Sequence, residues 1–163
     1  MRKVLIAASL LAAVAVSGTA AAAPPSGDSQ NAAKICKKMR TDMGAAVFKQ
    51  TFGTNKNKSN AFGKCVSKQT KAGNNAQTNA SKQCKAEQAA DPDAFKQKYK
   101  NLGKCVSEKA KLNSDAQQQA TINAAMQCKT ERSQDPQAFK EKYGTNKNKS
   151  NAFGKCVSQH ASA

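Results

Sequence analysis

The chain has 163 residues and a formal net charge of +17, from 27 Lys and Arg against 10 Asp and Glu. With six Phe, two Tyr and no Trp, a conventional hydrophobic core would be small, and a small core usually needs covalent support. The single histidine argues against an enzyme, and so does the absence of a Gly-rich phosphate loop or a serine-elbow motif.

Residues 1–23 have the layout of a secretory signal peptide. The positive start MRK precedes about 13 apolar residues, and small residues lead up to Pro24. A membrane anchor is the alternative, but roughly 20 apolar residues are needed to cross a bilayer. No second apolar segment follows. We therefore expect an exported chain of charge +15 without a transmembrane segment, either secreted or associated with the cell envelope.

Six cysteines divide the rest of the chain into three similar units. After a flexible segment at 24–33, we predict repeats at 34–73, 74–113 and 114–163. In each unit two cysteines bracket a shared frame of Asp, Phe, a second aromatic residue and Gly-Lys-Cys-Val-Ser. An even number of cysteines in an exported chain predicts three disulfides. The cysteines are Cys36, Cys65, Cys84, Cys105, Cys128 and Cys156.

Pairing within each unit is the simplest connectivity, because every unit then carries its own crosslink. In the chain-entropy model, closing a loop of this size stabilises the fold by about 3–4 kcal/mol. The alternative joins neighbouring units and leaves the first and last cysteines for each other: Cys65–Cys84, Cys105–Cys128 and Cys36–Cys156. No metal site, covalent haem or other cofactor is expected, because no Cys-x-x-Cys pair occurs and His160 lies near the chain end.

The local signals are helical, and we predict an all-α protein. Two Asp-Pro pairs, at 91–92 and 135–136, have the pattern of an N-cap followed by proline in the first helical turn. The first unit has Asp-Met-Gly at 42–44 instead, so its short helix begins differently. Alanines spaced every four residues predict a longer helix before each of these pairs, and Ser114 is a candidate cap for the last one. Each unit should contain a long helix, a short helix, a loop and a third helix, with one disulfide joining the first helix to the last.

A lysine- and asparagine-rich loop occurs in two identical copies. Residues 53–67 and 144–158 match at all fifteen positions, whereas the second unit lacks the seven residues TNKNKSN. Ammonium and amide groups together suit a polyanion, so we predict a polyanion-binding site here. A solvated turn that keeps the surface soluble is the simpler interpretation. The candidate residues are Lys56, Lys58, Lys64, Lys147, Lys149 and Lys155, with Asn55, Asn57, Asn60, Asn146, Asn148 and Asn151.

The composition favours a binding protein over a reader of nucleic-acid sequence. All eight aromatic residues fall in the repeated frame, where we expect them to fill a core and not to stack on bases. Lysine, a hydrated point charge, outnumbers arginine 23 to 2 after residue 23. We therefore expect a non-catalytic protein that binds anionic polymers (envelope polysaccharide, teichoic-type polymer or non-specific nucleic acid), with peripheral contact to a membrane surface. The alternative is a disulfide-stabilised secreted effector, antimicrobial or inhibitory.

The frame C…DPxAFxxKYGTNKNKSNAFGKCVS resembles repeats in small exported proteins of high-GC bacteria that have no assigned activity. The likeness covers residues 36–67, 84–107 and 128–158. The resemblance implies an exported bacterial protein, and it implies no activity, partner or site residue.

Overall fold

A computed structural model describes residues 27–162, so the predicted signal peptide lies outside the described residues. The described residues form seven α-helices and no strand, which confirms the predicted all-α class. The segment predicted to be flexible, 24–33, is helical from Gly27 onward. The helices are α1 (Gly27–Met43), α2 (Ala45–Phe52), α3 (Ala61–Ala90), α4 (Pro92–Tyr99), α5 (Leu102–Gln134), α6 (Pro136–Tyr143) and α7 (Ala152–His160).

Helices α4 and α6 begin where the Asp-Pro pairs predict. The Asp91 carboxylate accepts a hydrogen bond from the backbone N–H of Ala94 at 2.9 Å, and Asp135 accepts one from Ala138 at 2.9 Å. Such a cap is worth about 1 kcal/mol. The proline that follows has no N–H, which costs nothing in the first helical turn. Helix α2 has no side-chain cap and begins after Gly44, whose φ is 80°.

The third helix of one unit is continuous with the long helix of the next. Helix α3 covers 30 residues and α5 covers 33, so the predicted boundaries at 73/74 and 113/114 lie inside helices. The expectation of separate helices was therefore wrong, and Ser114 lies within α5 and caps nothing. The stretch around Gly73 is rich in Asn and Thr, which are poor helix formers, yet α3 packs along both α1 and α5. Tertiary packing here outweighs local propensity.

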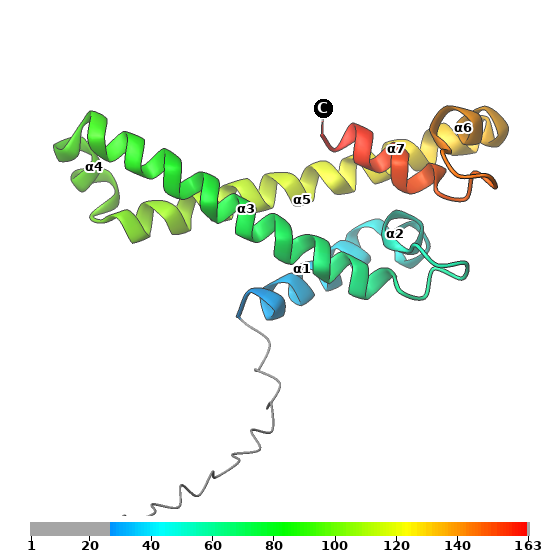
Figure 1. The fold of residues 1–163 in the computed structure, drawn as a ribbon, viewed down its shortest axis with the longest axis horizontal. Coiled ribbons are helices and arrows are strands. Elements are labelled where there is room, and N and C mark those ends of the chain that lie inside the picture. The colour runs from blue at the N-terminus through cyan, green and yellow to red at the C-terminus, as the bar shows by residue number, and fades with distance from the viewer. Residues whose placement is uncertain (1–26, 163) are drawn as a thin grey trace, which may run out of the picture.

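The two long helices set the shape of the molecule. Helices α3 and α5 pack against each other as an elongated hairpin closed by α4, with α1 and α2 against α3 and with α6 and α7 against α5 (Figure 1). The disulfides pair the cysteines of each unit, which confirms the simplest of the predicted connectivities: Cys36–Cys65, Cys84–Cys105 and Cys128–Cys156. They tie α1 to α3, α3 to α5, and α5 to α7.

Two hydrophobic clusters lie toward opposite ends of this hairpin. The larger cluster is shared by α1, α2, α3, α5, α6 and α7, so the first and third units have a common core. The smaller cluster lies beneath α4 and consists of Cys84, Phe95, Tyr99 and Cys105. Seven of the eight aromatic side chains are buried and Phe62 is half-buried, which confirms that the aromatic residues fill the cores.

Candidate functional site

The two identical loops, which precede α3 and α7, fold on themselves in the same way. In the first loop, the Asn60 side chain accepts a hydrogen bond from Thr54 N at 3.0 Å and donates one to the Thr54 hydroxyl at 2.8 Å. Asn55 donates to the Ser59 hydroxyl at 2.9 Å, and Asn57 accepts from Ser59 N at 3.2 Å. The amides predicted to contact a polyanion therefore hold the loop closed. The second loop repeats these bonds through Thr145, Asn146, Asn148, Ser150 and Asn151.

Lys58 and Lys149 also serve the fold of the loops. The Lys58 Nζ donates to the Gly53 carbonyl oxygen at 2.9 Å, and the Lys149 Nζ donates to that of Gly144 at 3.2 Å. Both lysines are half-buried and have positive φ angles, 58° and 55°. A Cβ at Gly53 would lie 2.6 Å from the Lys58 Cβ, and one at Gly144 would lie 2.7 Å from the Lys149 Cβ. A larger residue than glycine would clash at either position. This close contact gives a structural reason why both loops have the same glycine and lysine.

The other four predicted lysines are exposed to solvent. Lys56 and Lys147 lie at the tips of the loops, and Lys64 and Lys155 lie in the first turns of α3 and α7. Both loops project at the same end of the molecule, where α2 contacts α7 (Figure 1). The structure thus places the two predicted clusters at one end and leaves two exposed lysines in each.

A cluster of polar side chains that sequence analysis missed lies beside the third disulfide. The Tyr143 hydroxyl donates to Glu131 Oε2 at 2.7 Å. The His160 Nε2 lies 3.1 Å from that hydroxyl and 3.2 Å from Glu131 Oε1. The hydrogen bond from Tyr143 lowers the pKa of Glu131 below its ordinary value, and the positive charge of Lys142 lowers it further.

The second unit has a glutamate and a tyrosine at the corresponding positions, with a lysine in place of the histidine. Glu87 and Tyr99 correspond to Glu131 and Tyr143, and Lys109 takes the place of the histidine, with its Nζ 2.7 Å from Glu87 Oε1. The hydrogen bond from Lys109 is the main cause that lowers the pKa of Glu87.

In the first unit the corresponding positions are Met39, Phe52 and Gln69, and the cluster is less polar. The Gln69 Nε2 lies 3.5 Å from the Met39 Sδ, with both side chains buried. In every unit, therefore, a residue three positions after the first cysteine meets one four positions after the second. This spacing could have revealed the cluster from the sequence.

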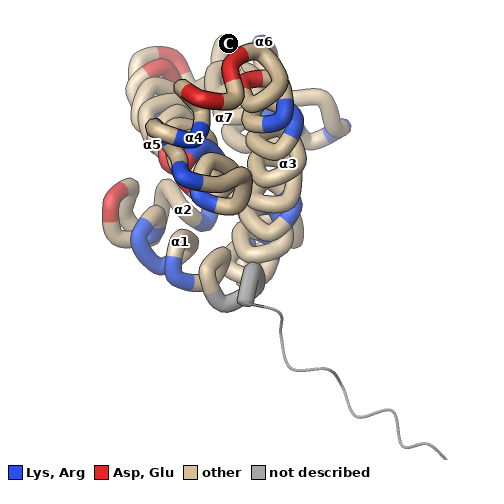
Figure 2. Tube along the Cα trace, turned by 90° about the vertical axis from the view of Figure 1, so that its left-hand side faces the viewer, with Lys and Arg blue, Asp and Glu red and all other residues tan. Residues whose placement is uncertain are grey.

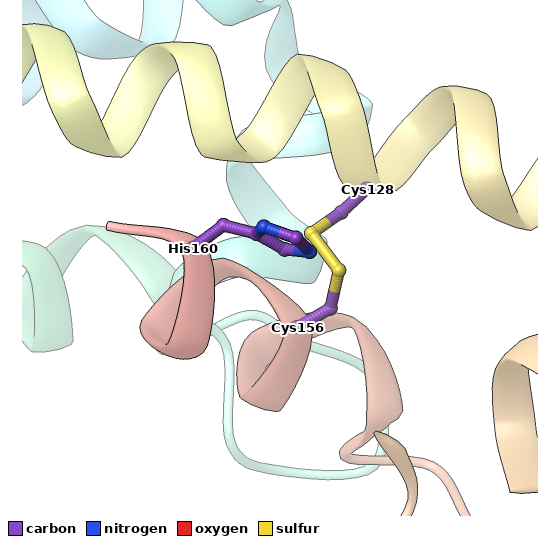
Figure 3. Close-up of side chains that lie close together, drawn as sticks. All are labelled: Cys128, Cys156 and His160. Carbon is purple, nitrogen blue, oxygen red and sulfur yellow. A yellow bond between two sulfur atoms is a disulfide. The ribbon is translucent and has the colours of Figure 1, made fainter. Parts of the chain in front are cut away.

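The side chains of Cys128, Cys156 and His160 converge on one point between α5 and α7 (Figure 3). Their potential ligand atoms lie within 4.8 Å of one another. The thiolate is the form of cysteine that ligates metals, and here the two sulfurs are bonded to each other. Lys109 and Gln69 occupy the position of His160 in the other two units. Each contacts a side chain on a neighbouring helix, so this position links two helices in all three units.

Lysine and arginine dominate the charged surface. Of the 25 basic residues after residue 23, none is buried, and only four are half-buried. In the view of Figure 2, basic positions recur along the length of α3. Within the described residues, four lysines form ion pairs with carboxylates: Lys38–Asp42, Lys109–Glu87, Lys142–Glu131 and Lys149–Glu141.

Comparison of the chain with protein-family models, with curated proteins and with solved structures finds no match. Among the described residues, no helix is both long enough and apolar enough to span a bilayer. The chemistry of the chain's own surface is therefore the basis for a functional proposal.

Proposed function

We propose that this is a non-catalytic exported protein that binds anionic polymers of the cell envelope or of the extracellular space. The observation that carries the proposal is the exposure of its cations. Of the 25 basic residues after residue 23, 21 are exposed, and of those only Lys38 and Lys142 lie in an ion pair within the described part of the chain. Attraction between such a surface and a polyanion is long-range, weakly selective and screened by salt.

The kind of cation favours polymers without bases over nucleic acid. Lysine supplies a hydrated point charge, whereas arginine supplies the planar fork that reads phosphates and guanine. One of the two arginines after residue 23, Arg132, is already engaged: it donates to Gln50 at 2.9 Å and lies 4.8 Å from the centre of the Phe153 ring. Since the aromatic side chains are buried or half-buried, they offer little surface for base stacking.

A location outside the cytoplasm is supported by the three disulfides. Disulfides form and persist in oxidising compartments and are rare in the cytosol. The signal-peptide pattern at residues 1–23 points the same way.

The alternative of a membrane-active effector receives less support. Insertion into a bilayer needs a helix with a broad apolar face. Among the described residues, the large hydrophobic side chains exposed to solvent are Leu112 and Met126, 67% and 44% exposed. Release of dye from anionic vesicles would favour the effector, whereas coating of the vesicles without release supports the binder.

Retention on isolated cell-envelope fractions tests the proposal. The protein without residues 1–23 should be retained at low ionic strength and released as salt is raised, because screening weakens exposed charge pairs. The lysine-acetylated protein is the matched control, since acetylation removes the charge and keeps the fold's apolar core. Failure of the unmodified protein to bind at low salt would refute the proposal.

A further inference from the structure

One face of α3 carries several lysines and no carboxylate. Five of its lysines are exposed. At 3.6 residues per turn they lie within an arc of about 100°, nearly opposite the side that buries Cys65, Ala76 and Ala80. We call this set the α3 lysine stripe; it consists of Lys64, Lys68, Lys71, Lys82 and Lys85.

No carboxylate interrupts this stripe. The chain has no Asp or Glu between Asp42 and Glu87, a stretch that contains eight lysines. The gap between Lys71 and Lys82 on this face holds the neutral side chains of Asn75 and Thr78. From its first lysine to its last, the stripe extends for about 32 Å at 1.5 Å per residue.

Helix α5 provides an internal comparison. Each long helix contains two cysteines, and counting from the first cysteine up to position 75 and from the second beyond it aligns the two helices. The α3 positions 64, 68, 71, 75, 82 and 85 then correspond to exposed α5 residues of mixed character: Lys104, Glu108, Lys111, Asp115, Met126 and Lys129. The α5 face therefore carries three lysines and two carboxylates, a net charge of +1, where the α3 face carries +5. The two faces occupy corresponding positions on the two long helices and differ mainly in charge.

We infer that the α3 lysine stripe is the binding surface for a linear, base-free polyanion, that is, a flexible polymer with repeated phosphate or sulfate groups. This inference rests on the proposed function and assigns it to one surface. A narrow row of charges on a straight helix matches an extended polymer better than a compact anion. The stripe contains no aromatic or arginine side chain, so it can attract backbone charge but has no group that reads bases.

The test is binding of inorganic polyphosphate and of a sulfated polysaccharide to three proteins across a salt series. The stripe variant replaces Lys64, Lys68, Lys71, Lys82 and Lys85 with Gln, which has a similar helix propensity. The control variant loses the same charge from exposed lysines elsewhere: Lys96, Lys104, Lys111, Lys129 and Lys140 to Gln. Far-UV circular dichroism checks that both remain helical.

For single-stranded chains, each lost phosphate contact lowers the slope of log affinity against log salt by about 0.7. The stripe variant removes five lysines, so the slope for polyphosphate should become less steep by about 3.5, and the control variant should lose less than half of that. Equal losses in the two variants would overturn the assignment to α3 while leaving the proposed function standing. Absence of binding by the parent protein would overturn both.

A gain-of-function variant makes the test independent of any folding defect. Glu108→Lys with Asp115→Asn turns the α5 face into a second stripe and should strengthen polyphosphate binding. If this variant binds polyphosphate no more tightly than the parent, a helix face of lysines without carboxylates is not what determines binding. The two probes distinguish phosphate from sulfate as the preferred group. Tighter binding of single-stranded DNA with an equal number of charges would overturn the choice of a base-free polymer.

Discussion

Replacing Gly144 with alanine should destabilise the third unit through a clash with backbone and side-chain atoms. The new Cβ would lie 2.6 Å from the Lys140 carbonyl oxygen and 2.7 Å from the Cβ and Cδ of Lys149. Ordinary contacts between such atoms are about 3.5–4.0 Å. Lys149 is poorly placed to withdraw, because its φ is 55° and its Nζ is bound to the Gly144 carbonyl oxygen. Overpacking of this kind costs about 1–3 kcal/mol.

Thermal unfolding with the disulfides intact measures this cost. For a chain of this size, a loss of about 1–3 kcal/mol lowers the Tm by roughly 3–10 °C. Gly73→Ala is the control: a Cβ at this position in α3 meets nothing within 4 Å, and alanine is favoured over glycine inside a helix by about 1 kcal/mol. That variant should be more stable than the parent. If Gly144→Ala unfolds at the parent's temperature, the loop does not depend on the close approach of Lys149.

Three further outcomes are expected. Replacing both cysteines of the disulfide at the α4 end, by Cys84→Ser with Cys105→Ser, should lower the free energy of unfolding by about 3 kcal/mol. Amide hydrogen exchange should speed up more in α4 than around the larger core. An equal increase in exchange over the whole chain would contradict this. The hydrogen bond from Tyr143 lowers the pKa of Glu131, so the stability it contributes is present above the ordinary value of 4.5 and is lost as the pH falls below it. Stability measured against pH should therefore fall less in a Glu131→Gln variant than in the parent over that acidic range, and equal slopes would refute the linkage. His160→Lys should keep the parent's Tm, because the second unit has lysine at this position, whereas His160→Ala should lower it; equal losses would show that the position does not bridge two helices.

Features fixed by local chemistry could be predicted from the sequence. The Asp-Pro pairs predicted the starts of α4 and α6, because an Asp side chain caps the N–H groups that the first helical turn leaves free. The repeated frame predicted the pairing of the cysteines, since each frame brings its second cysteine back beside the helix that carries its first. The regular spacing of the aromatic residues predicted their burial.

Features that depend on tertiary contact were not predictable in the same way. The residues around Gly73 have low helix propensity and by themselves predict a break. They are helical because α3 packs against both α1 and α5. Asparagine and lysine in the loops can bind either a ligand or their own backbone, and composition alone does not separate the two roles. The side chains of Asn60 and Lys58 hold the loop closed in this structure. The contrast between the faces of α3 and α5 becomes visible only when the residues of each helix are placed on its surface.

The measurement that most directly tests the proposed binding surface is an NMR titration of the isotope-labelled protein without residues 1–23 with inorganic polyphosphate. The amide chemical shifts should change mainly along residues 64–85 of α3, change little at the corresponding positions of α5, and return to their starting values when salt is added. Shift changes spread equally over both long helices, or centred on the loop tips at Lys56 and Lys147, would contradict the assignment of polyanion binding to α3.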